Sequence, residues 1–491
     1  MKKLLIFTAF LAGYLIMSLE LLGFRLLAPF FGYSIYVWGS LIGLILAALA
    51  GGYYLGGRLS EKKNDAAVLR ALFLAASVFL LLVLFTYQPI LGYFAGWSVI
   101  WGSMAATLAI FALPMVALAA TSPIIVRQLA QNNQPGYAAG AVYTWGTIGS
   151  LLGTFLTSFV LIPYLGSRLS LYSCFFLALV LLVVWLLPKN VKNLPYVGAI
   201  FLLSLFSLGK PALPTNVILE TESVYNQIRL IDDGRMVWLT LNSRRPVFMQ
   251  SAYVKEGTLT NFTLIDLFSI GPMIAPVKNL LVLGMAAGAS VRQYQQFFPD
   301  VKIDAVEIDA KLIEIAHERF GVSENANLKI FAADARPFLA KSDTKYDAVE
   351  IDLFQGSPYI PFYTATEEFF QSVLAHLSER GLLMMNVMAP GKQEILAPML
   401  ATIKTVFPSV YTISVNNNFL VLATTQKSNL EEIKKTIADT QTQSSPELKS
   451  ASGYALDFLK EYQADKKTPV FTDDWAPVEL LTYRMLKSAR L

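Results

Sequence analysis

The sequence predicts an α-helical membrane bundle, then a small β-rich module, then a parallel α/β domain. Of its 491 residues, 55% are hydrophobic and 15% are charged, which is too apolar for an ordinary soluble protein. Residues 1–209 hold 11 Lys/Arg and 3 Asp/Glu, whereas residues 210–491 hold 28 and 32. From residue 216 onward, long apolar runs give way to short alternating segments. We therefore expect domains at 1–209 (bundle), 216–275 (β module) and 276–491 (α/β).

Membrane spans are predicted from run length, because a helix that crosses a bilayer needs about 20 mostly apolar residues. The first run follows Met-Lys-Lys like a signal peptide, but its length and the Glu20 near its end indicate a retained helix. Small residues crowd several runs, which predicts close helix packing. Six long runs and a shorter seventh lie at residues 4–23, 35–57, 68–87, 98–120, 137–163, 167–188 and 194–209.

The basic loop residues predict a multi-pass protein of the inner cell membrane with a cytoplasmic amino terminus. Arg25 and Arg168 fall on the opposite side. Seven spans would place residues 210–491 outside, whereas a seventh run that does not cross leaves them in the cytoplasm, which is the side we expect. The predicted cytoplasmic set is Lys2, Lys3, Arg58, Lys62, Lys63, Arg70, Arg127, Lys189 and Lys192.

Residue usage excludes several kinds of chemistry. The single cysteine, Cys174, lies in an apolar run, and His317 and His376 fall in helix-like stretches. A disulfide framework, a metal site and Ser-His-Asp catalysis are therefore disfavoured. The basic excess lies in short membrane loops, so we expect no nucleic-acid partner. For Glu20 an interfacial ion pair with Arg25 is preferred over a polar substrate site inside the bundle.

The second half shows first a hairpin and then a βα alternation. In "YNQIRLIDDGRMVWLTLN" two alternating strands flank Asp-Gly, which is typical of a tight turn. A helix is predicted at 256–271 and a polar surface helix with a loop at 427–467. The alternation beyond 276 predicts a parallel sheet covered on both faces. Its strands are expected near 279–283, 302–307, 328–331, 346–352 and 381–387, with an antiparallel pair at 409–415 and 419–424.

The predicted strand ends carry the residues of interest, because ligands of such sheets bind at the carboxyl ends of the strands. The first strand leads into a turn of small residues from Gly284 to Gly288. Glu307 ends the second strand, about twenty residues beyond the turn, where a carboxylate can accept hydrogen bonds from ribose hydroxyls. Asp334 follows the third strand and suits an adenine amino group, and Asp352 ends the fourth. These acids favour an adenosine ligand without phosphate.

Each of these acids has a plainer interpretation as a helix N-cap or a solvated strand end. For Asp309, directly before a helix, the N-cap interpretation is preferred.

Several segments resemble the spermidine synthase (polyamine aminopropyltransferase) family, which has a class I S-adenosylmethionine-dependent, Rossmann-like fold. They are "SVYNQI", "SAYVKEG", "VLGMAAG", "VEID", "ADARPFL", "YDAVEID" and "FYTATEEFF", in the family's order. The first half, with "ELLGFRLLAPFFG" and "TSPIIVRQL", resembles the bacterial branch in which a multi-span domain precedes the synthase-like domain. The resemblance implies transfer of an aminopropyl group from decarboxylated S-adenosylmethionine, or use of S-adenosylmethionine, with an amine such as putrescine as acceptor. No tightly bound cofactor is implied, and a homodimer stays open.

The resemblance also assigns roles to single residues. Asp352 stands where the family keeps its proton acceptor. Glu307 and Asp334, with the adjacent Ala335 and with Asn226, stand at donor-binding positions, together with Gly284 and Gly288 of the turn.

On the amine side, Tyr225 and Tyr253 match tyrosines that border the family's amine pocket and donor site. Near the carboxyl end, Asp473 and Asp474 stand beside Trp475, where they could attract a polyamine. A solvated turn with a helix cap explains the same residues equally well.

Some positions depart from the family. Ala287 replaces an acid of the glycine turn that binds the donor's amino group, and Gln355 replaces an acid three residues beyond the proton acceptor. Lys255 would repel a polyamine if it faced the pocket. The sequence thus predicts a membrane-bound aminopropyltransferase-like enzyme. The alternative is a polyamine or nucleoside sensor or transporter whose synthase domain no longer turns over.

Overall fold

A computed structural model divides the chain into two compact units, Met1–Ala212 and Leu213–Leu491. The loop lysines Lys62, Lys63, Lys189 and Lys192, and residues 207–209 of the seventh apolar run, lie outside the described residues. The structure describes residues 1–61, 65–131, 134–186, 194–206, 213–242, 249–260, 263–356, 358–391, 394–442, 444–465 and 467–489.

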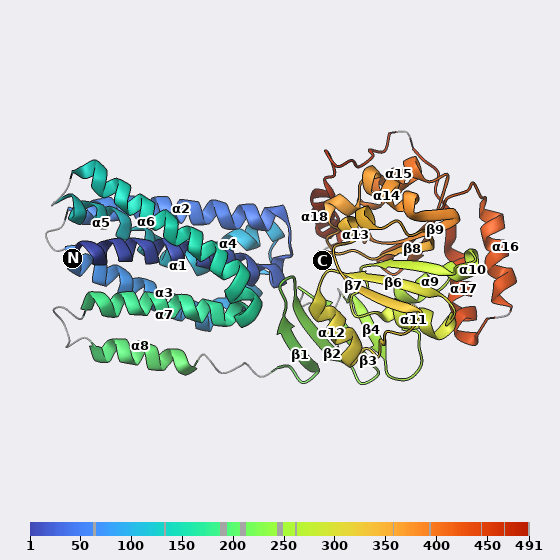
Figure 1. Ribbon diagram of the computed structural model, residues 1–491, viewed down its shortest axis with the longest axis horizontal. Helices are drawn as coiled ribbons and strands as arrows, with labels where there is room; N and C mark the ends of the chain where they lie inside the picture. The colour runs from blue at the N-terminus through green and yellow to red at the C-terminus, as the bar shows by residue number, and fades with distance from the viewer. Residues whose placement is uncertain are drawn as a thin grey trace. The chain divides into compact units, whose positions relative to one another are not determined.

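The first unit is helical throughout its described residues, and each predicted apolar run forms a helix (Figure 1). The helices are α1 (Lys2–Phe31), α2 (Ile35–Ser60), α3 (Asp65–Phe94), α4 (Val99–Ala119), α5 (Thr121–Ala130), α6 (Pro135–Leu156), the π-helical segment η1 (Thr157–Leu165), α7 (Gly166–Leu186) and α8 (Leu194–Phe206).

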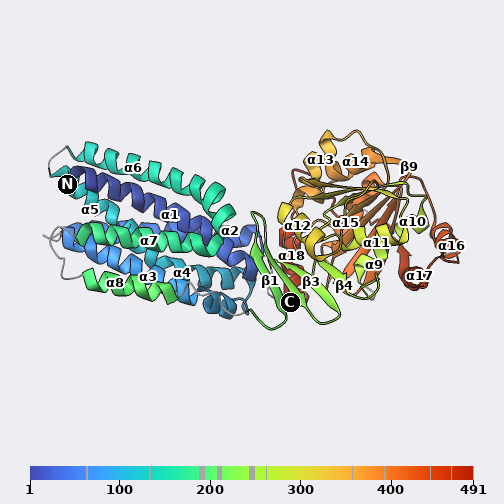
Figure 2. The same ribbon diagram turned by 60° about the horizontal axis from the view of Figure 1, so that its bottom comes forward.

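Among the described residues of this unit, five continuous helical segments are long and apolar enough to cross a membrane. The fifth, residues 135–186, comprises α6, η1 and α7, which form two separate rods in Figure 2. The break lies at Gly166, whose φ of 76° ends the π-helical segment. The six long runs predicted from the sequence thus correspond to six rods, and the 13-residue α8 is shorter.

Glycines let α1 and α6 pack against each other. A Cβ atom added to Gly149 would lie 1.9 Å from the backbone oxygen of Phe10, and one on Gly153 would lie 2.4 Å from that of Tyr14. The contacts advance by four residues on both helices, so the helices run parallel. This is the close approach through small residues that the sequence predicts.

Glu20 does not form the ion pair with Arg25 that the sequence analysis favoured. Five residues along an α-helix turn a side chain by about 140°, so the two groups point to different faces. Arg25 instead donates to the Tyr33 hydroxyl at 3.4 Å. Among the described residues, no hydrogen bond or ion pair reaches the Glu20 carboxylate.

The second unit begins with a four-stranded antiparallel sheet in the order β1-β2-β3-β4. The predicted Asp-Gly hairpin joins β2 to β3, with Gly234 at a φ of 93° and its N–H donating to Asp232. The strands are β1 (Val217–Glu222), β2 (Gln227–Asp232), β3 (Met236–Leu241) and β4 (Ser251–Val254).

An eight-stranded sheet follows, in the order β12-β10-β11-β9-β8-β5-β6-β7. From β9 to β7 neighbouring strands are parallel, and β11, β10 and β12 continue antiparallel. The elements are α9 (Leu264–Phe268), α10 (Gly271–Ile274), β5 (Asn279–Leu283), α11 (Ala289–Phe297), β6 (Lys302–Glu307), α12 (Ala310–Arg319), β7 (Leu328–Ala332), α13 (Ala335–Lys341), β8 (Tyr346–Ile351), the 3-10 turn η3 (Phe362–Thr364), α14 (Glu367–His376), β9 (Leu377–Met388), α15 (Leu396–Val406), β10 (Ser409–Val415), β11 (Asn418–Thr424), α16 (Leu430–Gln441), α17 (Pro446–Phe458), β12 (Leu459–Glu461) and α18 (Val478–Ala489).

Both faces of this sheet are covered, as the continuous apolar strands require. Leu280 and Val282 of β5 belong to a core that includes residues of α9, α11 and α12, whereas Leu281 and Leu283 belong to a core with α13, α14 and α15. The strand order reverses at β5, between β6 and β8, which is where such folds bind ligands. The predicted α/β domain with a parallel sheet covered on both faces is confirmed, and its strand order is that of a doubly wound, Rossmann-like fold.

Two predicted helices differ from the structure. The helix expected at 256–271 is reduced to α9 and α10, and the polar stretch 427–467 forms α16, α17 and the short edge strand β12.

Alanine at Gly149 should destabilise the bundle, because its Cβ would overlap a backbone carbonyl of α1 and overpacking costs about 1–3 kcal/mol. Gly140→Ala in the same helix is the matched control, since nothing lies within 4 Å of its added Cβ. Thermal unfolding of the detergent-purified protein should show a lower midpoint for Gly149→Ala alone. Equal midpoints would contradict the packing described.

Candidate active site

The turn after β5 lets two backbone segments approach closely. Gly284 and Gly288 have φ values of 87° and 77°, which favour glycine. A Cβ atom on Gly284 would lie 2.3 Å from the backbone oxygen of Asp352, so no larger residue fits there. Gly288 is the N-cap of α11. The predicted turn residues therefore form one wall beside the end of β8.

Glu307 ties this turn to the end of β6. Its carboxylate accepts hydrogen bonds from the backbone N–H of Ala286 at 2.9 Å and of Asp309 at 3.0 Å. Only 7% of the residue is exposed. Burial raises the pKa of Glu307 to about 7, although both backbone hydrogen bonds act to lower it. Each oxygen keeps a lone pair that can accept a further donor.

Asp334 is the N-cap of α13 as well as a strand-end acid. One oxygen accepts from the Arg336 N–H at 3.0 Å, and the other accepts from the Tyr363 hydroxyl at 3.1 Å. Burial, assisted by the Asp334 charge, raises the pKa of Tyr363 to about 12. Ala335, the first residue of α13, is buried. A helix cap thus accounts for one oxygen of Asp334.

Asp352 follows β8 and meets a residue from the neighbouring strand β9. Asn386 Nδ2 donates to Asp352 Oδ1 at 2.9 Å. Burial raises the pKa of Asp352 to about 7, and the Asn386 hydrogen bond opposes this shift. The buried Oδ1 of Asn386 has no hydrogen-bond partner among the described residues. Sequence reasoning missed Asn386, although it is one polar residue inside the apolar segment "LLMMNVM".

The β module reaches the site through the turn before β2. Asn226 Nδ2 donates to Asp309 Oδ2 at 2.8 Å, two residues beyond Glu307, and Asn226 Oδ1 accepts from Asn242. Asp309 also caps α12, as the sequence predicted. Tyr225 is 45% exposed.

Tyr253 of β4 and Lys255, directly after this strand, have structural partners. The Arg292 guanidinium lies 4.6 Å from the centre of the Tyr253 ring, and Phe320 packs edge-on at 6.2 Å. Lys255 Nζ contacts both carboxylate oxygens of Asp232 at 2.8 Å. Its charge is therefore already compensated within the β module.

The remaining predicted residues are placed differently. Asp473 pairs with Arg336 at 2.8 Å and accepts from the Thr366 hydroxyl at 2.7 Å, so this carboxylate supports α13 and α14. Gln355 and Asp474 are exposed, and no hydrogen bond joins their side chains to the described strand-end acids.

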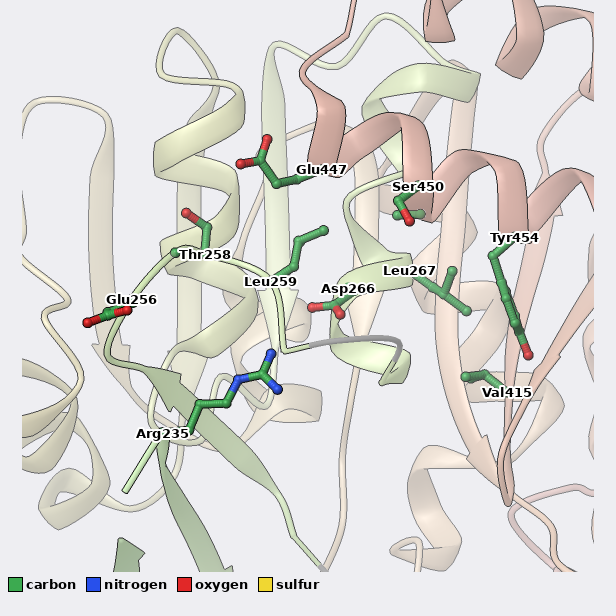
Figure 3. Close-up of a pocket in the computed structure, with 12 residues that line it drawn as sticks. Arg235, Glu256, Thr258, Leu259, Asp266, Leu267, Val415, Glu447, Ser450 and Tyr454 are labelled. Carbon is green, nitrogen blue, oxygen red and sulfur yellow. The ribbon is translucent and has the colours of Figure 1, made fainter. Parts of the chain in front are cut away.

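A hollow of about 250 Å³ lies elsewhere in the second unit (Figure 3). Its lining comes from the segment after β4, from α9, from α17 and from the end of β10. Arg235 and Glu447 are among the residues drawn around it. None of the strand-end acids lines it, so we place the candidate active site at the ends of β5, β6 and β8.

Asp352→Asn should stabilise the protein increasingly as pH rises. The raised pKa of Asp352 means that its contribution to stability is lost between its ordinary value of 3.8 and about 7. The variant lacks this loss and keeps the size and polarity of the side chain. The difference in free energy of unfolding between variant and wild type should grow from about pH 4 to about pH 7, by at most about 1.4 kcal/mol per pKa unit. A difference that does not change with pH would contradict the burial of this carboxyl.

The comparisons with known proteins find a family similar to part of the second unit. Residues 267–426 match the family model of the spermine/spermidine synthase domain. A probable polyamine aminopropyl transferase of Bifidobacterium longum is 31% identical over 287 residues, 54% of this chain and 62% of that protein. Polyamine aminopropyltransferase 2 of Aquifex aeolicus is 24% identical over 429 residues, 82% of each chain.

This chain spans less than two thirds of the Bifidobacterium relative's length. A crystal structure of a probable spermidine synthase from Corynebacterium glutamicum matches 54% of this chain and 97% of its own, with 18% identity and a TM-score of 0.42. The family match covers the turn and all three strand-end acids. Residues 267–426 are therefore similar to the spermine/spermidine synthase domain, the family that the motifs resemble.

Proposed function

We propose that this protein is a membrane-bound aminopropyltransferase that uses decarboxylated S-adenosylmethionine as donor and putrescine or a related amine as acceptor. The observation that carries the proposal is the arrangement at the ends of β5, β6 and β8. There the turn approaches the backbone of Asp352, and Glu307 accepts from the same turn.

The donor's nucleoside suits the polar groups of this site. The free lone pairs of Glu307 can accept both ribose hydroxyls, and Asp334 can accept the adenine amino group. A phosphate group would be repelled by the carboxylates of this site. An uncharged sugar and base are therefore the preferred occupants.

The acceptor chemistry needs a group that removes a proton. The amine nitrogen attacks the carbon next to the sulfonium, so a C–N bond forms, the C–S bond breaks and methylthioadenosine leaves. Asp352 takes the proton, and a pKa of about 7 suits a general base at neutral pH. Ala287 and Gln355 have no carboxyl group, so neither supplies the acid that the family keeps at its position. The acceptor is therefore proposed only as a class of amine.

We place the first unit in the inner membrane with both the amino terminus and the second unit in the cytoplasm. If each of the six helical rods crosses the membrane once, the chain returns to the side of its amino terminus. The 13 residues of α8 span about 20 Å, which is less than the roughly 30 Å of a bilayer's hydrocarbon core. The cytoplasm is also where the donor is made.

Asp352→Asn should reduce methylthioadenosine release by at least about 100-fold, the usual range for loss of a general base. Purified full-length protein would be given decarboxylated S-adenosylmethionine and a panel of diamines, and methylthioadenosine would be measured. Asp439→Asn, an exposed acid of α16, is the control and should retain activity. Tight donor binding by the wild type without any release would instead support the non-catalytic sensor.

A reporter at the carboxyl end should score as cytoplasmic, because six crossings leave the second unit on the side of Lys2. Fusions after Ser60 and after Phe94 calibrate the assay, since they follow two and three rods and should report opposite sides. An external carboxyl-terminal reporter would show that α8 crosses and would remove the enzyme from its donor.

A further inference from the structure

Glu350 is a buried acid that the proposed mechanism does not use. It lies two residues before Asp352 on β8, and only 1% of it is exposed. Its neighbours on the adjacent strands are Val282 of β5 and Met384 of β9, both apolar. An ionised carboxylate in such surroundings is costly unless polar groups compensate it.

The polar partners of Glu350 come from α11. Ser290 Oγ donates to Glu350 Oε1 at 2.6 Å, and the Tyr294 hydroxyl lies 2.7 Å from Oε2. The same hydroxyl lies 3.1 Å from the backbone oxygen of Phe268. A tyrosine has one hydroxyl proton, so it cannot donate to both oxygens. Both contacts are satisfied only if Glu350 carries a proton, which it donates to Tyr294 while Tyr294 donates to Phe268.

We propose that Glu350 is protonated at neutral pH and is a positioning residue, which fixes α11 and the glycine turn that precedes it as one wall of the donor site. Ser290 lies in the first turn of α11 and Tyr294 in the second, so one side chain holds the helix at two points. The link to donor binding rests on the proposed function, whereas the proton on Glu350 does not.

The charges around Glu350 support the neutral form. Burial raises the pKa of Glu350 to about 8, the contacts with Ser290 and Tyr294 oppose this, and the Asp352 charge adds to it. On α9, Asp266 is already bonded to Thr260 and to Gln293 of α11. Ionisation of Glu350 would put a second negative charge near Asp352 and leave the Phe268 oxygen without its tyrosine proton.

Glu350→Gln separates charge from shape, because the amide can accept from Ser290 and donate to Tyr294 as the protonated acid does. The full-length protein would be titrated by infrared difference spectroscopy, and methylthioadenosine binding would be measured by calorimetry from about pH 6 to about pH 9. The wild type should show a carboxylic-acid C=O band that disappears near pH 8 and is absent from the variant. Its affinity for methylthioadenosine should fall several-fold over this transition, and the affinity of Glu350→Gln should not.

Glu350→Ala should bind methylthioadenosine weakly at every pH, and Glu256→Gln, an exposed acid, should behave as the wild type. The proposal would be overturned if the carboxylic-acid band of the wild type persists in Glu350→Gln. It would also be overturned if the affinity for methylthioadenosine depends equally on pH in both proteins. If Glu350→Gln does not fold, Tyr294→Phe tests the same point. This variant removes the hydroxyl that accepts the Glu350 proton, so the carboxylic-acid band of Glu350 must shift. If the wild type binds no methylthioadenosine, the proposed function fails, and the infrared titration still decides the protonation of Glu350.

Discussion

Desolvation of carboxyl groups at one edge of a parallel sheet is the constraint on which the second unit depends. Glu307, Glu350 and Asp352 sit on or directly after β6 and β8, and burial raises the pKa of each. The sheet places them there because parallel strands end together at the point where the strand order reverses. Backbone N–H groups, Ser290, Tyr294 and Asn386 offset part of the cost. The part of the desolvation cost that is not offset keeps the pKa of each group near neutral pH, where the group can exchange a proton.

The fold could be predicted where hydrophobic periodicity is strong. The apolar runs, the Asp-Gly hairpin and the β5 to β9 strands lie within a few residues of their predicted positions, because long buried segments leave little freedom. Prediction was poorer at 256–271, where residues 256–260 form no helix and Ser269 and Ile270 separate α9 from α10, and at 427–467. There α17 runs into β12, whose pairing with β10 depends on the sheet rather than on local pattern.

The site could be predicted in part, because strand-end acids and glycine turns are visible as local patterns. Contacts between residues on different strands are not visible as local patterns. Asn386 meets Asp352 only because β9 adjoins β8, and the Arg336 bond to Asp473 joins residues 137 positions apart. The Glu20 pairing was wrong for a local reason, since residues five apart on a helix do not share a face.

The contact between Arg336 and Asp473 also bears on how the protein is made. Chains emerge from the ribosome one residue at a time, so α13 and the Asp334 cap are exposed while the following 137 residues are still being translated. Until Asp473 is translated, Arg336 lacks its carboxylate partner and the Thr366 hydroxyl lacks its acceptor. The cross-link between α13 and the start of α14 is therefore completed only after the chain has been translated beyond β12 and has reached residue 473.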